Sequence, residues 1–469
     1  MDMEQEKDLT RRDVVKAAGA ATVLAAARKL EGAPAIQTVK AANSQVQYGM
    51  IGTGSRGSYL LKHLKGIDNG RCVAVCDINQ DHLDKGAATI GTNPDKFKDY
   101  RELLAKRDVD AVFVVTPLFL HFPITKDTLE AGKHTFCEKS LVFRPEEVHA
   151  LRPLATSRPK QILQVGLQRR YSQYYQLLKD MVDKGVLGNV THVHAQWHRN
   201  PGWVLKPDPD PQQQRMNNWR LYREYSGGLA AELASHQIDV ADWMFGSPPE
   251  YVIGVGGLDV RKDGRDIYDN IQLIYKYPKN QKLTYSAIST NAHLPYFNAT
   301  RSEMGECIMG TEGAVEITVG DDKAMPIAMW FKEPPQPKVT KAGEVKENWK
   351  AGATMVAGAV MKGLPIIAER DEFTGKESFL DREMKFARRW LYTKGVMVPE
   401  ETRNPVDTEL ESFFNSCRDG QRPRADLEVG LNDSIGVILS NLCMDQERRV
   451  YFNEIEKMGR ENAPAAKKV

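Results

Sequence analysis

Three glycines near the start of the chain are the first residues whose spacing could serve chemistry. Gly52, Gly54 and Gly57 form a Gly-x-Gly-x-x-Gly pattern at the end of an apolar run over 46–51. The first glycine of such a pattern permits a tight turn, the second lets the backbone approach a pyrophosphate, and the third lets a helix pack closely on the strand. The phosphates then lie on the free N–H groups of the helix N-terminus. The residues expected to contact a dinucleotide in this turn are Gly52, Thr53, Gly54, Ser55, Arg56 and Gly57.

An acidic residue after the next apolar run supports a dinucleotide site. Residues 71–76 have the pattern of a second strand, and Asp77 follows them, about 20 residues after Gly57. A carboxylate at this spacing binds the hydroxyls of the adenosine ribose. It would also repel a 2′-phosphate, so Asp77 favours NAD over NADP. A glycine-rich turn with a capping aspartate is the alternative interpretation of these residues.

The elements that must position these residues alternate between strands and helices. Strands are expected at 46–51, 71–76, 110–115, 134–137 and 161–165, with helical segments between them. This pattern predicts an α/β fold whose first domain, residues 41–165, is a doubly wound Rossmann domain. In such a sheet, ligands bind beyond the carboxyl ends of the strands. The residues expected on that edge, beside the cofactor, are Asp77, Thr116, Pro117, His121, Glu138 and Lys139.

Length and composition limit the class of protein. The 469 residues suffice for two domains, and 41% hydrophobic with 27% charged residues is ordinary for a soluble globular protein. A formal net charge of +2 gives no sign of a nucleic-acid partner. The six cysteines are scattered without a Cys-x-x-Cys pair, which indicates free thiols rather than a disulfide framework. No stretch is long and apolar enough to predict a membrane span.

Residues 1–40 have the features of an export signal. Arg11-Arg12 precedes an alanine-rich apolar run over 17–27, and an Ala-x-Ala pattern follows at 33–35. The combination predicts a twin-arginine signal peptide with its linker, and hence a periplasmic or otherwise extracytoplasmic protein. An alanine-rich helix that happens to contain Arg-Arg is the alternative. Because no free NAD pool exists outside the cytoplasm, we hypothesise that NAD is bound before export, is held tightly and is regenerated in place.

Further short motifs follow in order along the chain. They are Gly52-x-Gly54-x-x-Gly57, Thr116-Pro117-x-x-x-His121, Glu138-Lys139-Ser140, Gly166-Leu167-Gln168-Arg169-Arg170-Tyr171, Lys184-Gly185-Val186-Leu187-Gly188, Gly227-Gly228-x-x-x-Glu232-x-x-x-His236-x-x-Asp239 and Gly310-Thr311-Glu312-Gly313. This ordered set resembles the Gfo/Idh/MocA family of NAD(P)-dependent sugar oxidoreductases over about 46–318, and weakly again at 405–455. Two residues depart from the family pattern: Ser140 replaces a proline, and Glu232 replaces the usual aspartate.

The resemblance implies that Lys139, His236 and Glu232 are catalytic. In the family's dehydrogenases the matching lysine donates hydrogen bonds to the reacting oxygen, where an ammonium stabilises a developing alkoxide. Imidazole suits proton abstraction from a sugar hydroxyl. Glu232, four residues earlier, is expected to share the helical face of His236 and to orient it or balance its charge. The spacing by itself fits a structural histidine equally well.

The resemblance also implies a second α/β domain, residues 166–469, with a large and mostly antiparallel sheet. An insertion is expected at about 320–400, and residues 200–215 have the composition of a loop. Helices are expected at 173–184, 227–243 and 379–392, and strands at 190–198, 250–257, 270–276, 282–287 and 314–318. Gln168 is expected beside the cofactor. The residues expected to bind the substrate are Arg170, Trp219, Arg220, Tyr222 and Asp239, although loop packing explains the aromatic residues equally well.

A histidine-rich strand leaves a further alternative open. His192, His194 and His198 fall on one face of the strand over 190–198, because side chains alternate along a strand. Together with Glu232 and His236 they could hold a metal. We favour a polar sheet face at a subunit contact and expect no metal, because the family often dimerises through this sheet.

Three functions remain open on the sequence. The favoured one is an exported NAD-dependent oxidoreductase that acts on a sugar or glycoside hydroxyl and regenerates its bound NAD internally. The second is a redox-neutral, NAD-dependent glycoside hydrolase or lyase, because some members of the family oxidise a ring hydroxyl transiently and then restore it. The third is a non-catalytic protein that binds a sugar or NAD, which the departures at Ser140 and Glu232 suggest.

Overall fold

The computed structural model describes residues 45–295, 297, 303–319, 327–332 and 403–460, with short pieces at 348–350, 353–355, 363–365, 391, 394 and 396. From Val46 onward the chain belongs to one unit. The predicted signal peptide at 1–40, most of the predicted insertion at 320–400 and most of the predicted helix at 379–392 lie outside the described residues. No helix among the described residues is long and apolar enough to cross a membrane.

The first domain is built on a six-stranded parallel sheet in the order β3-β2-β1-β4-β5-β6. This order confirms the predicted doubly wound Rossmann domain, and it places the reversal of strand order between β1 and β4. Its strands are β1 Val46–Ile51, β2 Gly70–Cys76, β3 Asp95–Phe97, β4 Ala111–Val114, β5 His134–Cys137 and β6 Leu163–Val165. Its helices are α2 Ser55–Leu64, α3 Gln80–Ile90, α4 Tyr100–Ala105, α5 His121–Glu130 and α6 Pro145–Thr156.

The second domain has a nine-stranded sheet in the order β16-β13-β12-β11-β7-β10-β9-β8-β17. Only the pairing of β7 with β10 is parallel within it, which confirms the mostly antiparallel expectation. Its strands are β7 Val190–His198, β8 Tyr251–Gly257, β9 Asn270–Lys276, β10 Lys282–Ile288, β11 Met304–Gly310, β12 Gly313–Val319, β13 Ile327–Lys332, β16 Gly363–Pro365 and β17 Val450–Tyr451. A separate hairpin pairs β14 Asn348–Lys350 with β15 Ala353–Met355.

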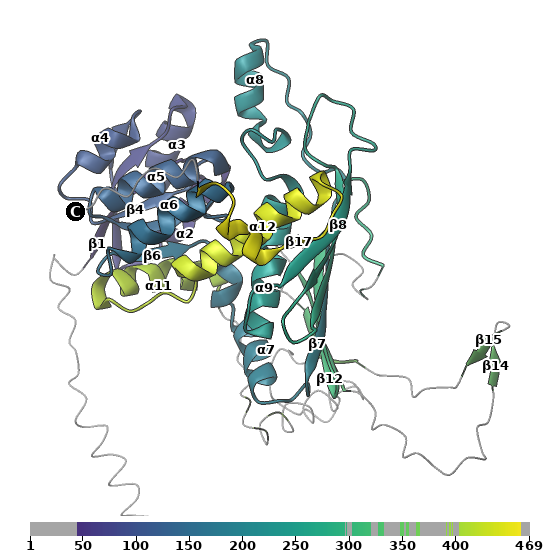
Figure 1. Cartoon of the computed structure of the whole chain (residues 1–469). Helices are drawn as coiled ribbons and strands as arrows, with labels where there is room; N and C mark the ends of the chain where they lie inside the picture. The colour runs from purple at the N-terminus through teal and green to yellow at the C-terminus, as the bar shows by residue number, and fades with distance from the viewer. Residues whose placement is uncertain are drawn as a thin grey trace, which may run out of the picture. The chain divides into compact units, whose positions relative to one another are not determined.

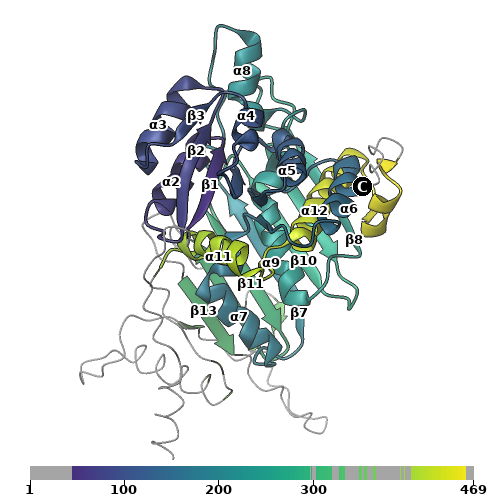
Figure 2. The same cartoon turned by 90° about the vertical axis from the view of Figure 1, so that its left-hand side faces the viewer.

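Helices cover one face of the large sheet. These are α7 Gln173–Asp183, α9 Ser235–Phe245 and α12 Leu427–Asp445 (Figures 1 and 2). Val193 and Ala195 of β7 are buried on the covered face, while His192 on the other face is exposed. The alternation follows from the two-residue period of a strand. The helices therefore pack on one face of the sheet, and α9 places the predicted catalytic His236 on that face.

The C-terminal helices bind both domains together. Helix α11, Pro405–Asp419, returns to the Rossmann domain, where Phe413 and Phe414 pack against Phe113 of β4 at ring-centroid distances of 5.2 and 5.8 Å. Helix α12 then packs on α6, α9 and β8. Its Ser434 accepts a hydrogen bond from the Val142 amide at 3.3 Å. Two elements distant in sequence thus hold the strand-end edge of the first domain against the helix face of the second.

One local expectation was wrong. The segment expected to be a loop at 200–215 contains the start of α8, Pro211–Asn217. Asp210 caps this helix by accepting from the amides of Gln212 and Gln213, and Pro211 provides a preset first-turn φ. The helix expected over 227–243 is confirmed, with a π-helical turn at Ala230–Ala234 before α9.

Candidate active site

The glycine turn between β1 and α2 fits a pyrophosphate. A side chain on Gly52 would overlap the carbonyl oxygen of Val115, and one on Gly57 would overlap that of Gly52, so both positions require glycine. Gly54 differs because the nearest atom to a Cβ there would be Nδ1 of His82, at 3.7 Å. Gly54 is also the N-cap of α2, with no side-chain cap and no acidic residue in the first turn. The helix N-terminus therefore offers uncapped N–H groups beside open space, as a bound pyrophosphate requires.

Asp77 lies at the carboxyl end of β2 and is fixed beside that turn. Its Oδ2 accepts from the Thr53 amide at 2.8 Å, and its Oδ1 accepts from the Asn79 amide at 2.8 Å. The carboxylate keeps a side-chain exposure of 10%. Asp77 therefore stands at the ribose end of the predicted dinucleotide site, with its orientation set by backbone donors.

A chain of polar contacts links three more of the predicted cofactor residues. Nε of Arg56 donates to Oε1 of Glu138 at 2.6 Å, and Nη2 donates to Oε1 of Gln168 at 3.4 Å. Oε2 of Glu138 accepts from the Lys139 amide at 3.2 Å. Burial alone would lower the pKa of Arg56, but Glu138 outweighs it and the pKa is raised. The contacts hold the loop after β5 close to the first turn of α2.

His121 joins two strand-end loops. Its Nδ1 and Nε2 lie 2.8 and 3.0 Å from the carbonyl oxygens of Ser140 and Thr116. Burial lowers the pKa of His121, although both carbonyls act in the opposite direction. The peptide bond between Lys139 and Ser140 is cis. His121, Thr116 and Pro117 thus occupy the predicted edge, where the histidine ring holds the loop that carries Lys139.

The ammonium of Lys139 lies at the π-helical turn of the second domain. Its Nζ donates to the carbonyl oxygens of Ala231 at 3.0 Å and Glu232 at 2.9 Å. A lysine ammonium has three donors, so one remains for a further acceptor. Burial lowers the pKa of Lys139, while Glu232 and Glu138 act in the opposite direction. The ammonium is thereby aimed between the cofactor edge and α9.

His236 is buried on α9, and one of its ring nitrogens makes no hydrogen bond. Its exposed fraction is 7%, and its Nδ1 has no hydrogen-bond partner. The imidazole lies 5.9 Å from the ring of Trp197 on β7, centroid to centroid. Burial, followed by the charges of Lys139 and Arg169, lowers the pKa of His236 well below 6.5. The imidazole is therefore neutral at pH 7 and able to accept a proton.

Glu232 does not orient His236 as predicted. Its Oε2 accepts from Nε of Arg220 at 2.9 Å. Burial alone would raise the pKa of Glu232, but Arg220 and Lys139 outweigh it and keep the pKa below its usual value. Glu232 lies within the π-helical turn at Ala230–Ala234, whereas His236 lies on the following α-helix α9.

The predicted substrate residues lie in three different surroundings. Arg170 and Asp239 bind each other at 2.7 Å, and the Asp239 side chain is 2% exposed, so this pair indicates a positioning role for both. Tyr222 is buried in a small apolar cluster within the loop. Trp219 and Arg220 remain near the site, with the guanidinium 4.2 Å from the indole. Direct substrate contact by any of these five residues stays a prediction.

The structure adds two candidate site residues that the sequence did not single out, Arg199 and Tyr285, beside the aromatic residue Trp197. Three side chains on the covered face of the sheet have buried polar atoms without a partner: Nε1 of Trp197, Nε and Nη2 of Arg199, and Oη of Tyr285. Tyr285 of β10 pairs with Ala195 of the parallel strand β7. Trp197 and Arg199 follow Ala195 at two-residue spacing and so share its face. The two-residue spacing in the sequence indicates that Trp197 and Arg199 share a face. Tyr285 joins this face only through the pairing of β7 with β10.

The histidine strand does not supply the alternative metal site. His198 binds Ser286 at 2.8 Å through Nε2 and the His293 carbonyl at 2.6 Å through Nδ1. The three strand histidines lie on the face opposite Trp197, whereas His236 packs against Trp197. Within the described part of the chain, no three His, Cys, Asp or Glu side chains form a group able to hold a metal.

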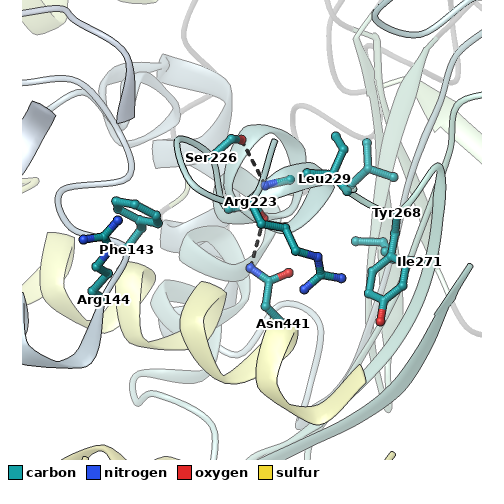
Figure 3. Close-up of a pocket in the computed structure, with 11 residues that line it drawn as sticks. Phe143, Arg144, Arg223, Ser226, Leu229, Tyr268, Ile271 and Asn441 are labelled. Atoms are coloured by element: carbon teal, nitrogen blue, oxygen red, sulfur yellow. Dashed lines mark hydrogen bonds between the residues drawn. The ribbon is translucent and has the colours of Figure 1, made fainter. Parts of the chain in front are cut away.

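A hollow of about 240 Å³ lies beside the segment that leads into the π-helix and α9. It is bordered by Phe143 and Arg144, by the turn before the π-helix, by Tyr268 and Ile271, and by Asn441 of α12 (Figure 3). Asn441 donates to the Gly227 carbonyl at 2.9 Å, and the Gly228 amide donates to Ser226 at 3.0 Å. Lys139 and His236 are not among its lining residues. These contacts hold the turn before the π-helix. The π-helix that follows supplies the carbonyl oxygens of Ala231 and Glu232 that Lys139 binds.

Comparison with known families agrees with this geometry. Residues 46–167 match the family model described as "Oxidoreductase family, NAD-binding Rossmann fold", and residues 175–316 match the "GFO/IDH/MocA C-terminal domain". The chain belongs to the Gfo/Idh/MocA family. The first match also confirms the NAD-binding domain predicted from the glycine pattern.

Individual relatives in the Gfo/Idh/MocA family include sugar and inositol enzymes. An inositol 2-dehydrogenase of Gluconacetobacter diazotrophicus is 35% identical over 44% of this chain and 55% of its own length. This chain spans 38% to 61% of the length of that protein and two similar curated relatives. An aldose–aldose oxidoreductase of Caulobacter crescentus, solved with glycerol, has a TM-score of 0.63 at 18% identity, covering 87% of this chain and 99% of its own. A scyllo-inositol dehydrogenase of Lactobacillus casei, solved with NAD(H) and scyllo-inositol, has a TM-score of 0.60 at 17% identity, covering 87% and 99%. These structures share the fold.

Proposed function

We propose that this Gfo/Idh/MocA protein is an NAD-dependent oxidoreductase that acts on a hydroxyl of a sugar or glycoside. One observation carries the proposal: a lysine ammonium with a spare donor lies beside a neutral, buried histidine, at the carboxyl edge of an NAD-binding sheet. The family membership and the inositol and sugar relatives support it.

The residues suggest a division of labour during oxidation. A ring nitrogen of His236 takes the hydroxyl proton, and the third donor of Lys139 stabilises the oxygen as negative charge develops on it. NAD, when bound, supplies the acceptor for the hydride that leaves the carbon. Arg220 keeps the carboxylate of Glu232 charged, and this carboxylate balances the positive charge of the Lys139 ammonium. The glycine turn, Asp77 and the Arg56–Glu138–Gln168 contacts hold the cofactor and its loop.

Replacing the two proposed catalytic side chains tests this function. Lys139→Ala and His236→Ala should each lower kcat by about 10²- to 10⁴-fold on a competent sugar, while NAD binding measured by fluorescence persists. Lys126→Ala is the matched control, because Lys126 forms an exposed ion pair with Glu130. Full activity in both catalytic variants would contradict the assignment. Release of an aglycone without net NADH would instead support the redox-neutral alternative.

The pH profile of the wild-type enzyme provides an independent check on His236. The base must be neutral to accept a proton, so activity falls on the acid side as pH drops through its pKa. Because that pKa is lowered well below 6.5, the acid limb of kcat/KM should lie below pH 6.5. An acid limb centred at or above pH 6.5 would exclude His236 as the base that controls the profile.

We further propose that the protein is exported by the twin-arginine route with NAD tightly bound. The Arg11-Arg12 pattern supports export, and the name of the aldose–aldose oxidoreductase is consistent with transfer between two sugars. Denaturing the purified protein without added cofactor should release NAD or NADH at close to one per chain. Empty supernatant together with rapid exchange of added NAD would contradict internal regeneration.

The face of the large sheet opposite α7, α9 and α12 carries exposed apolar side chains, which supports self-association as a further proposal. Val255 and Ile274 on this face are 66% and 42% exposed. Burying such apolar side chains against a second copy would remove them from water. Light scattering should then give a mass of at least two chains, and Val255→Lys with Ile274→Lys should reduce it.

A further inference from the structure

Arg199 extends the covered face of β7 toward the proposed substrate site. Its amide donates to the Ile288 carbonyl at 2.8 Å, so the strand pairing with β10 continues through it. Its side chain falls on the face of Trp197 and Ala195, two and four residues earlier. Along the strand, Arg199 and Trp197 are separated by about 7 Å. Arg199 therefore stands further along the same surface that places Trp197 against His236.

The guanidinium of Arg199 lacks the partner that other guanidinium groups near the site have. Its Nε and Nη2 are buried without a hydrogen-bond partner. Burial is the main cause of its lowered pKa, and the charges of Glu303 and Glu232 act against it without outweighing it. The neighbouring pairs are Arg56 with Glu138, Arg169 with Glu306, Arg170 with Asp239, and Arg220 with Glu232. Among the described residues, no carboxylate forms an ion pair with Arg199.

The geometry of the unpartnered atoms identifies the chemistry that would satisfy them. Nε–H and one N–H of Nη2 leave a guanidinium from the same planar edge, where two carboxylate oxygens fit side by side. Trp203 stacks on the guanidinium at 4.4 Å and fixes the direction of this edge. A buried charge without a partner is costly, so an anion that completes the pair gains more here than at an exposed arginine.

We infer that Arg199 recognises a carboxylate on the substrate, and hence that the substrate is an acidic sugar such as a hexuronic acid. This inference rests on the proposed oxidoreductase function and names its substrate class. The carboxylate binds the free edge of Arg199, and the sugar ring lies along the sheet face toward Trp197 and Tyr285. Their unpartnered Nε1 and Oη serve the ring oxygens, and the reacting hydroxyl lies at Lys139 and His236.

Matched acidic and neutral sugars test the inference. Wild-type protein is assayed by NADH formation with glucuronate against glucose, and with galacturonate against galactose. We expect kcat/KM to favour the acidic member of at least one pair by about 100-fold or more. Arg199→Gln should lower kcat/KM for that acid by about 100-fold and leave the neutral sugar within about threefold. Arg101→Gln is the control, because the Arg101 side chain is 67% exposed.

A binding measurement makes the test independent of turnover. With NAD present, the uronate should raise the melting temperature of the wild type but not of Arg199→Gln or Arg199→Met, whose folding is checked by circular dichroism. Absence of uronate stabilisation in the wild type, equal effects of Arg199→Gln on acidic and neutral sugars, or a preference for glucose 6-phosphate over glucuronate would each overturn the inference. Oxidation of neutral sugars alone would overturn it while leaving the proposed function intact, and failure to bind NAD would remove the function itself.

Discussion

The cofactor edge and the sheet face differ in how their polar groups are satisfied. On the cofactor edge, Asp77 receives backbone amides, Arg56 binds Glu138, and His121 meets two carbonyl oxygens. On the sheet face, Trp197, Arg199 and Tyr285 keep buried polar atoms without partners. An unsatisfied buried group costs free energy, which a bound ligand can offset. The named groups of the cofactor edge are thus satisfied by the chain itself, whereas the named atoms of the sheet face are those that the proposed substrate would satisfy.

Removing a satisfied group on the cofactor edge should have the largest effect on stability. Glu138→Ala leaves the guanidinium of Arg56 without its carboxylate and should lower the free energy of unfolding by about 1–3 kcal/mol. Urea denaturation measures the change. Glu130→Ala, which removes an exposed partner of Lys126, should cost less than about 1 kcal/mol. Equal losses in the two variants would contradict a stabilising role for the contact between Arg56 and Glu138.

Removing an unsatisfied group on the sheet face should affect binding instead. Tyr285→Phe deletes a hydroxyl that has no partner, so the free energy of unfolding should stay within about 0.5 kcal/mol or rise. The KM for the preferred sugar should rise by about 3- to 10-fold, because the bound sugar oxygen then loses the Tyr285 hydroxyl as its partner. Steady-state kinetics and urea denaturation on the same preparation separate these effects. A destabilised variant with unchanged KM would show that Tyr285 supports only the fold.

A buried carboxyl behind the cofactor edge gives the smallest expected effect. Both oxygens of Glu409 on α11 are buried without a partner, and burial, followed by Glu138, raises its pKa well above 4.5. The folded chain therefore keeps a proton that the unfolded chain loses near pH 4.5, so this group makes stability fall as pH rises above that value. Glu409→Gln should raise the melting temperature by about 1–3 °C at pH 8 and by less at pH 5.

The interpretation depends on whether the gain in melting temperature is larger at pH 8 or at pH 5. Calorimetry at both pH values should show the larger gain at pH 8, because the glutamine has no proton to lose. A larger gain at pH 5, or a loss at pH 8, would mean that Glu409 is ionised in the folded protein and has a partner. It would then belong with the satisfied groups of the cofactor edge.

Prediction from sequence succeeded where the signal was local or periodic. The Rossmann order followed from alternating strands and helices, and the glycine turn from the separate demands on Gly52 and Gly57. It failed at the partner of Glu232, because helical spacing does not predict a contact with Arg220 from the preceding segment. It also treated Pro211 as a loop residue, although Asp210 before it is an N-cap. The first error concerns a tertiary contact and the second concerns the capping of a helix end, and neither follows from periodicity.

The sequence by itself determined the Rossmann domain, the placement of Asp77, Glu138 and Lys139 at strand ends, and the presence of a histidine on a following helix. These depend on residue types and on the two- and 3.6-residue periods, which act over a few residues. Only the tertiary structure decided that Glu232 binds Arg220, that β7 pairs with β10 so that Tyr285 joins Trp197, and that Nε and Nη2 of Arg199 are buried without partners. Partner choice and burial depend on residues far apart in the chain, which meet only when the two domains pack.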